Sequence, residues 1–252
     1  MSEGTSPLTT VDKAIDVLFH LHGTGGPCGV TALAHALDAP KSSIHRILSA
    51  LARRGLVERE AGGRYRTGVA LMALGLGVLE REPVVVAARP ALEAAADAIG
   101  ETFFLVAARA GELIVLEKAE GTGFLRAAPR VGGAVPVHAT AVGKLYLALA
   151  PEQIDADPLE ARRVFTERTL VDREALEAEV EIVRRTELAT NRDEWIPGLT
   201  VLAAPVRIGE RLVGAVALAA STPRVDELGE QTLTDRVRRA AAEVTARLSG
   251  TE

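Results

Sequence analysis

The segment KSSIHRILSALAR, residues 41–53, decides the fold of the first part of the chain. Its apolar residues follow the i, i+3, i+4, i+7 spacing of a single helix face: Ile44, Ile47, Leu48 and Leu51. Gly55 follows two residues later and is a typical helix stop. The segment therefore predicts a helix that buries one apolar face and leaves a polar, basic face outside.

Two further helices and a hairpin are expected around this segment. Apolar residues at helical spacing from Val11 to Leu21 predict a first helix, which ends at Gly23. Thr31 is the expected N-cap of a short second helix that stops before Pro40. Residues 56–60 and 64–67 flank Ala-Gly-Gly and predict a β-hairpin. Three short helices and a glycine-tipped hairpin are typical of a winged helix-turn-helix domain.

The charge of the chain is unevenly distributed. The 252 residues carry a net charge of −5, which by itself argues against a nucleic-acid partner. Residues 41–66, however, contain 7 basic and 2 acidic side chains. This asymmetry indicates a short surface that faces nucleic acid on a mildly acidic protein. A solvated charged surface is the alternative interpretation.

Candidate DNA contacts lie on the outward side of the 41–53 helix and on the hairpin. Small polar and basic side chains on this helix suit the major groove: Ser42, Ser43, His45, Arg46 and Ser49. Other basic residues are expected to contact phosphates, which position a protein without reading sequence: Lys41, Arg53, Arg54, Arg64 and Arg66. Alternatively, each is an ordinary surface residue, and the two hairpin arginines only keep the hairpin soluble.

A linker helix and a second domain are expected to follow. Residues 69–82 are helix-compatible and apolar nearly all round, which is typical of a helix packed between domains or subunits. The predicted division is therefore 1–68, a linker helix at 69–83, and 84–252. The last part alternates predicted helices (84–99 with a kink at Pro90, 140–150, 172–187, 226–248) with predicted strands (102–109, 112–120, 124–127, 200–208, 211–220). This order indicates an α+β domain with a largely antiparallel sheet.

Several classes of protein are disfavoured. Cys28 is the single cysteine, which excludes an internal disulfide and a multi-cysteine zinc site. No apolar run reaches the roughly 18–20 residues of a membrane helix, and no secretion signal is visible, so a cytoplasmic protein without a membrane partner is expected.

An enzymatic role is the weaker alternative. Gly143-Lys144 is reminiscent of a phosphate-binding loop, but His138 and Leu145 stand where that motif requires Gly and Ser or Thr. No cofactor and no metal are expected. A hydrolytic or other enzymatic activity on a small-molecule-binding fold remains open as a second interpretation.

Three groups of segments resemble the IclR family of bacterial transcription regulators, and together they span about Thr9 to Leu248. The first is VDKAIDVL at 11–18 with PKSSIHRIL at 40–48. The second is PVHATAVGK at 136–144. The third is NRDEWIPG at 191–198, followed by AAPV at 203–206 and VGAV at 213–216.

The resemblance implies a fold, partners and a role. It implies an N-terminal winged helix-turn-helix domain, a linker helix and a C-terminal effector-binding domain of the GAF/profilin-like α/β kind. It implies a homodimer, often a dimer of dimers (a tetramer), on operator double-stranded DNA. A ligand-responsive regulator, more often a repressor, is therefore expected, with a small organic acid as its effector.

The resemblance also implies an effector site at the start of the helix after the histidine motif. Carried over to this chain, the backbone around Ala141 and Val142 would bind the acid, because free N–H groups at a helix N-terminus attract a carboxylate. Asn191 would hydrogen-bond the ligand. His138 either lies at the mouth of this pocket or fixes the turn before the helix, and Trp195 either stacks on the ligand or belongs to the core.

The sequence departs from the family at three positions of the expected pocket. Where studied members have a cysteine and two serines, this chain has Val201, Ala217 and Ala219. A buried polar ligand would lack these partners. We therefore expect an effector more apolar than glyoxylate, such as an aromatic or aliphatic acid.

Overall fold

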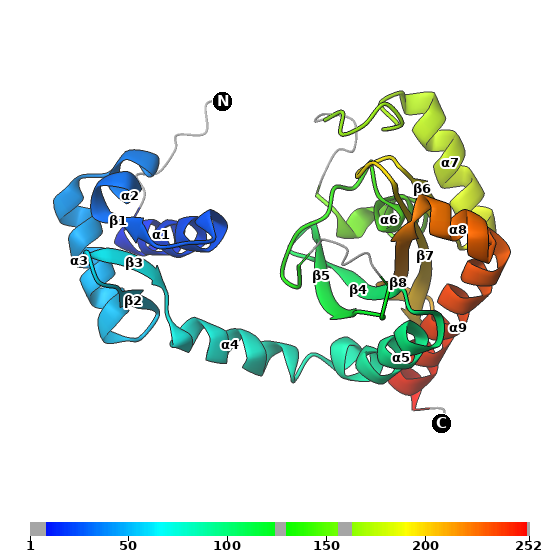
Figure 1. The fold of residues 1–252 in the computed structure, drawn as a ribbon, viewed down its shortest axis with the longest axis horizontal. Helices are drawn as coiled ribbons and strands as arrows, with labels where there is room; N and C mark the ends of the chain where they lie inside the picture. Colours follow the sequence, from blue (N-terminus) through cyan, green and yellow to red (C-terminus); the bar gives the residue numbers. More distant parts are fainter. Residues whose placement is uncertain (1–8, 124–129, 156–162, 251–252) are drawn as a thin grey trace. The chain divides into compact units, whose positions relative to one another are not determined.

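The computed structural model describes residues 9–123, 130–155 and 163–250 and divides the chain into two compact units. Unit 1 is Met1–Val78 and unit 2 is Leu79–Glu252 (Figure 1). The predicted division at residues 68 and 83 remains a proposal. No helix within the described ranges is long and apolar enough to cross a membrane.

The described part of unit 1 before residue 68 contains three helices and a small sheet. Its elements are α1 (Thr10–Thr24), β1 (Cys28–Gly29), α2 (Val30–Ala36), α3 (Lys41–Arg53), β2 (Val57–Arg59) and β3 (Arg64–Thr67). The strands pair antiparallel in the order β1-β3-β2. The predicted winged helix-turn-helix is confirmed, with β2 and β3 as its wing.

The core of unit 1 is built from the apolar faces that the sequence predicts. Four side chains are completely shielded from solvent: Val17, Leu33, Ile44 and Leu48. They come from α1, α2 and α3, and Tyr65 of β3 packs with them. The predicted inward face of α3 is thus the side that joins the three helices, which leaves its polar side outside.

Two local predictions for unit 1 are wrong. Thr31 does not cap α2, because the helix begins one residue earlier and Gly29 is the N-cap, without a side-chain hydrogen bond. The first helix continues past Gly23 to Thr24, and Gly25 ends it in the left-handed conformation. The two-residue strand β1, in which Cys28 pairs with Tyr65, was not predicted because so short a strand has no periodicity.

Helix α4 (Val69–Leu79) follows the wing and has no buried residue. It ends before Glu82, the predicted end, because Pro83 occupies the first turn of the next helix and Glu82 is the N-cap of that helix. At its start, Gly68 lies so close to the chain that an added Cβ would be 2.2 Å from the Gly55 carbonyl oxygen. Only glycine fits there, since the junction passes directly over the turn that ends α3.

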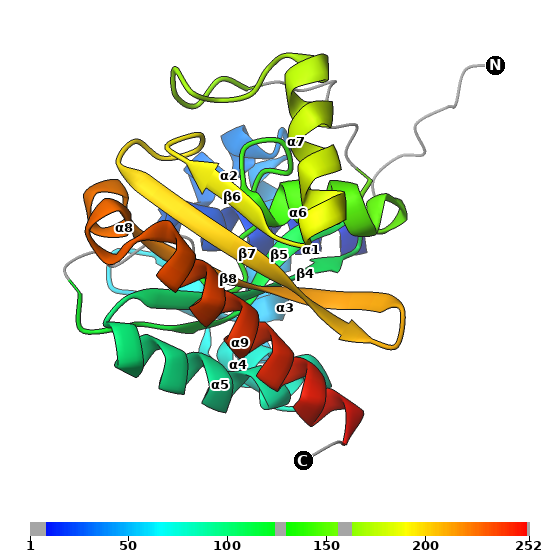
Figure 2. The ribbon, with the colours of Figure 1, turned by 90° about the vertical axis from the view of Figure 1, so that its right-hand side faces the viewer.

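Unit 2 is an antiparallel sheet between two layers of helices. The strands are β4 (Thr102–Arg109), β5 (Glu112–Ala119), β6 (Ala189–Arg192), β7 (Leu199–Ile208) and β8 (Arg211–Ser221), in the order β5-β4-β8-β7-β6. The helices are α5 (Pro83–Ile99), α6 (Ala141–Leu149), η1 (Pro151–Gln153), α7 (Arg173–Thr186), α8 (Thr222–Leu228) and α9 (Glu230–Ser249). Helices α5 and α9 cover one face of the sheet, and α6 and α7 cover the other (Figure 2). The predicted α+β class is confirmed.

Some boundaries in unit 2 differ from prediction. The predicted closing helix is two helices, because Gly229 has a φ of +82° and separates α8 from α9. Helix α5 continues through Pro90 without ending. Strand β6 was not predicted, and the predicted strand 124–127 lies outside the described residues.

Candidate functional site

The outward face of α3 is open to solvent. Five of its predicted DNA contacts are exposed, namely Lys41, Ser42, His45, Arg46 and Arg53, while Ser43 and Ser49 are partly exposed. Ser49 Oγ donates a hydrogen bond to the His45 carbonyl oxygen at 2.8 Å, so its hydroxyl oxygen remains an acceptor. The face therefore presents small polar groups and long cations together.

The N-terminus of α3 is also uncovered. Its N-cap is Pro40, which makes no side-chain cap hydrogen bond. The backbone N–H groups of Lys41 and Ser42 have no partner within the helix, because the first N–H groups of any helix point outward. Such a helix terminus is suited to bind phosphate.

The cations of α3 and those of the wing differ in their surroundings. Arg66 forms ion pairs with Glu58 at 2.9 Å and with Glu60 at 3.4 Å. Arg64 donates a hydrogen bond from Nη2 to the Pro27 carbonyl oxygen. In the described part of the chain, Lys41, Arg46 and Arg53 have no ion pair. The sequence predicts the hairpin but not which of its side chains meet, so this difference is seen only in the structure.

Glu58 joins the wing to helix α4. One carboxylate oxygen accepts from Arg66, and the other accepts from the Val69 backbone N–H at 3.2 Å. Arg66 foremost, together with this N–H, lowers the pKa of Glu58 below its ordinary value. Glu58 therefore caps the first residue of α4 while it holds a wing arginine.

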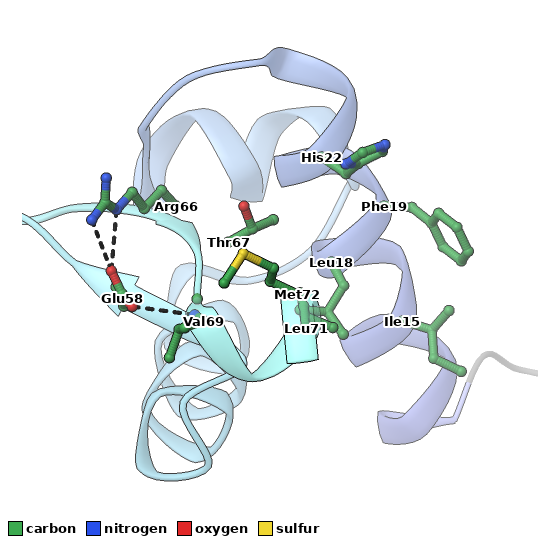
Figure 3. A pocket seen from close by; sticks show the side chains of 11 residues that line it. Ile15, Leu18, Phe19, His22, Glu58, Arg66, Thr67, Val69, Leu71 and Met72 are labelled. Atoms are coloured by element: carbon green, nitrogen blue, oxygen red, sulfur yellow. Dashed lines mark hydrogen bonds and ion pairs between the residues drawn. The ribbon is translucent and has the colours of Figure 1, made fainter. Parts of the chain in front are cut away.

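A groove of about 730 Å³ lies between α1 and the start of α4, within unit 1. Its walls are largely apolar side chains: Ile15, Leu18, Phe19, Val69, Leu71 and Met72. Figure 3 shows Leu71 and Met72 facing Leu18, with Ile15 and Phe19 projecting beyond them. Phe19 is 72% exposed and Met72 is 60% exposed, so unit 1 leaves a large apolar surface uncovered.

A small cavity of about 40 Å³ lies in unit 2 between the sheet and the first turn of α6. Five of the six predicted effector residues line it: Val142, Asn191, Val201, Ala217 and Ala219. Ala141 is buried at the start of α6 but is not among the lining residues. The remaining walls come from Phe104, Val106, Val135, Thr140, Trp195 and Leu199. Among the described lining residues, Thr140 and Asn191 have polar side chains and Trp195 adds one indole N–H.

The first turn of α6 is held tightly against the loop before it. Thr140 Oγ1 donates to the Pro136 carbonyl oxygen at 2.7 Å and accepts from the Gly143 backbone N–H at 3.0 Å. A Cβ at Gly143 would lie 1.7 Å from the Val137 carbonyl oxygen, so only glycine allows this approach. The Ala141 and Val142 N–H groups lie ahead of the helix's own acceptors and have no intrahelical partner.

Asn191 and His138 are occupied by the protein itself. Asn191 Nδ2 donates to the Ala139 carbonyl oxygen at 2.7 Å, and its Oδ1 accepts from the Glu194 N–H at 2.9 Å. Asn191 therefore retains one amide hydrogen for a ligand. His138 does not line the cavity; its Nε2 lies 3.0 Å from the Arg163 carbonyl oxygen and its ring stacks on Phe165. This arrangement favours the alternative in which His138 fixes the turn.

Sequence reasoning missed Phe104 and Val106 as cavity residues. Phe104 pairs with Ala217 across β4 and β8, and Val201 pairs with Ala219 across β7 and β8. Side chains on paired strands face the same side of a sheet. Strand alternation would have found Phe104 and Val106 if the pairing of β4 with β8 had been known.

A buried ion pair behind the cavity was also missed. Lys144 of α6 is 1% exposed, and its Nζ lies 2.6 Å from Glu194 Oε1. Burial raises the pKa of Glu194 above its ordinary value, although Lys144 opposes this shift. In the part of the chain that the structure describes, no group of three or more His, Cys, Asp or Glu residues could hold a metal ion.

Comparison with known proteins identifies both units. Residues 10–61 match the family described as the IclR helix-turn-helix domain, and residues 76–246 match the bacterial transcriptional regulator IclR C-terminal family. The regulator SauR of Cupriavidus necator is 32% identical over 220 residues, which cover 84% of this chain and 86% of SauR.

Solved structures of IclR proteins have the same fold as this chain. An IclR transcriptional regulator from Silicibacter sp. has a TM-score of 0.80 at 28% identity, with 96% of each chain covered. An IclR homologue from Microbacterium hydrocarbonoxydans, solved with 4-hydroxybenzoate, has a TM-score of 0.83 at 22% identity and covers 96% of this chain and 100% of its own. The second shows likeness of fold alone.

The matched families and these relatives are regulators and not enzymes. The helix-turn-helix family matches the winged unit, and the C-terminal family matches the unit that holds the cavity. The chain therefore belongs to the IclR family of bacterial transcriptional regulators, with a DNA-binding helix-turn-helix domain and an effector-binding C-terminal domain.

Proposed function

We propose that this regulator is a repressor that binds operator DNA through α3 and is controlled by a small, largely apolar organic acid. The observation that carries the proposal is the cavity in front of α6, whose described walls are largely hydrocarbon, with polar groups at Thr140, Asn191 and the indole N–H of Trp195. Repression is the commoner role that the family resemblance implies.

On the DNA side, α3 enters the major groove. Ser42, His45 and Arg46 reach base edges, with Ser43 and Ser49 beside them, and Lys41 and Arg53 contact phosphates. The exposed, unpaired state of Lys41, Arg46 and Arg53 among the described residues supports these roles. Arg64 and Arg66 contact phosphates only after exchanging Pro27, Glu58 and Glu60 for DNA.

On the effector side, the ligand carboxylate binds at the N-terminus of α6. The Ala141 and Val142 N–H groups and the helix dipole supply the favourable electrostatics. Val201, Ala217 and Ala219 then face the hydrocarbon part of the ligand. Hydrocarbon walls cannot replace the water that a small polar oxo-acid would lose on burial.

The size of the cavity favours a short acid. A water molecule needs roughly 10–15 Å³ of such space, so a cavity of about 40 Å³ holds only a few water-sized groups. A short aliphatic acid such as butyrate is therefore closer to this size, and we expect an aromatic acid to bind only if the half-buried Trp195 side chain moves. The homologue solved with 4-hydroxybenzoate makes aromatic acids the second class to test.

The apolar groove of unit 1 supports a dimer, or a dimer of dimers. A second copy of this chain would cover Phe19 and Met72, together with the exposed Leu74, Leu76 and Val78 of α4. We propose that the effector acts through α4, by favouring one arrangement of the two winged domains over another. In this proposal, a Phe19→Asp, Met72→Asp variant has a lower mass by light scattering than the unaltered chain, whereas an unchanged mass would contradict the interface.

Calorimetry with glyoxylate, butyrate and benzoate tests the effector class. We expect butyrate or benzoate to bind at least tenfold more tightly than glyoxylate. The control is the Ala217→Ser, Ala219→Ser variant, which adds polar partners and should shift the preference toward glyoxylate. Tighter binding of glyoxylate than of both apolar acids to the unaltered chain would refute the proposal.

A further inference from the structure

Lys144 is a charged residue that the effector site does not use directly. Its side chain is 1% exposed although it lies in α6, the helix whose first turn faces the cavity. Nζ donates to Glu194 Oε1 at 2.6 Å and to the Thr190 carbonyl oxygen at 2.9 Å, and it lies 3.5 Å from Glu179 Oε2. All three acceptors lie outside α6, so Lys144 ties this helix to α7, to β6 and to the loop after β6.

Glu194 makes several hydrogen bonds, but one of its carboxylate oxygens has no hydrogen-bond partner among the described residues. Its backbone N–H donates to Asn191 Oδ1, and its carbonyl oxygen accepts from Thr169 Oγ1 at 2.7 Å. Its second carboxylate oxygen, Oε2, is buried and has no hydrogen-bond partner among the described residues. Burying a charged group with an unmade hydrogen bond is unfavourable. A contribution to stability alone therefore does not explain why Lys144 and Glu194 are buried together.

The residues next to Glu194 belong to the cavity. Trp195 follows it directly, and Asn191, which accepts from the Glu194 N–H, lies three residues before it. Both line the cavity opposite α6. The corner from Asn191 to Trp195 is thus held at two points, to the loop just before α6 by the Asn191–Ala139 hydrogen bond and to α6 itself by the Lys144–Glu194 pair.

We propose that Lys144 and Glu194 are a positioning pair that holds the Asn191–Trp195 corner against α6 and thereby sets the width of the cavity and its affinity for the effector. The affinity part of this inference rests on the proposed function; the positioning part does not. Replacement of a buried ion pair by neutral groups is often tolerated in stability. Removal of both charges together should therefore leave a folded protein in which the corner is no longer fixed.

Trp195 reports the position of the corner without any ligand, because it is the single tryptophan of the chain. In the full-length Lys144→Met, Glu194→Gln variant we expect a red-shifted emission and at least a twofold increase in acrylamide quenching. The matched control is Arg173→Ala, Glu177→Ala, which removes an exposed ion pair of α7 and should leave Trp195 unchanged. A folded double variant with wild-type emission and quenching would overturn the proposal.

A second pair of variants covers the case in which the double variant does not fold. Glu194→Gln keeps an oxygen that accepts from Lys144, so it should retain the wild-type Trp195 emission. Glu194→Ala removes that acceptor and should show the red shift. Equal emission in these two variants would contradict a positioning role.

Binding of butyrate and of benzoate tests the affinity part of the proposal. We expect the double variant to bind the preferred acid at least tenfold more weakly than the wild type, with Arg173→Ala, Glu177→Ala unaffected. If the double variant bound the acid as tightly as the wild type although its Trp195 emission was red-shifted, the affinity part of the proposal would be overturned. If neither acid binds the wild type while Trp195 is loosened in the variant, the proposed effector class fails and the positioning role stands.

Discussion

A short glutamate–cation pair lies at the functional surface of each unit, and the two pairs differ in exposure. Glu58 and Arg66 lie on the wing at 2.9 Å, with side chains 39% and 54% exposed. Glu194 and Lys144 lie behind the cavity at 2.6 Å, with side chains 10% and 1% exposed. The pKa of Glu58 is lowered, chiefly by Arg66, whereas that of Glu194 is raised, chiefly by burial.

Exposure determines what each pair can do. An exposed pair is screened by water and contributes little, so a DNA phosphate can displace Glu58 from Arg66. A buried pair cannot exchange partners with solvent, and loss of one member leaves an uncompensated charge. The wing pair is therefore suited to exchange, and the cavity pair is suited to hold a fixed geometry.

The largest effect should follow from removal of one member of the buried pair. Lys144→Met leaves Glu194 buried and unpaired and should lower the free energy of unfolding of unit 2 by about 3–5 kcal/mol. Urea unfolding followed by Trp195 fluorescence measures this change. The matched variant Arg66→Ala should leave the unfolding midpoint of unit 1 unchanged within error. Equal losses of unfolding free energy in the two variants would contradict the proposed difference between the buried and the exposed pair.

Removal of an α3 cation should affect DNA binding more than removal of a wing cation. Arg46→Ala should weaken binding to the operator by about 10- to 100-fold, the effect of one lost base contact. Arg66→Ala should have a much smaller effect, because Arg66 is already paired with Glu58 and Glu60. Fluorescence anisotropy with the operator and with random DNA separates the two. A loss for Arg46→Ala that is as large on random DNA would argue against base contact.

Release of the wing arginine should strengthen DNA binding. Glu58→Gln removes the carboxylate that competes with phosphate, so affinity should rise a few-fold. The slope of log affinity against log salt should steepen by about 0.9 for one added phosphate contact. Glu60→Gln, in the more distant pair, should do less. An unchanged slope in Glu58→Gln would show that Arg66 does not contact phosphate.

The smallest effect concerns pH. The raised pKa of Glu194 means that the native state keeps a proton which the unfolded chain loses near pH 4.5. The unfolding free energy of unit 2 should therefore fall as pH rises from about 4.5 through the raised native value. Glu194→Gln should remove this part of the slope. If wild type and Glu194→Gln gave the same pH dependence, Glu194 would not be the group responsible.

The sequence predicted the surface of α3 well because that surface depends on one helix. The spacing of Ile44, Ile47 and Leu48 fixes which side of α3 is buried in unit 1, and the remaining side is exposed. Helix ends were less predictable, as Thr31 shows, because a cap depends on the conformation of the residue before it.

The cavity could be predicted only in part, because it depends on contacts between distant residues. The family resemblance supplied Val142, Asn191 and the hairpin positions, but Phe104 enters through its register with Ala217. Lys144 and Glu194 are separated by 50 residues, and no local pattern joins them. From the sequence alone, Gly143-Lys144 was compared with a phosphate-binding loop and did not match it. In the structure, Gly143 permits a close approach of the backbone, and Lys144 forms the buried ion pair with Glu194.

The most direct test of the account is the release of DNA by an apolar acid, measured on one complex. The full-length protein is bound to a labelled promoter fragment from upstream of its own gene, and butyrate, benzoate and glyoxylate are titrated while anisotropy is recorded. We predict release by butyrate or benzoate at concentrations at least tenfold below any effect of glyoxylate. Release by glyoxylate alone, or no binding to the promoter at low salt, would contradict the account.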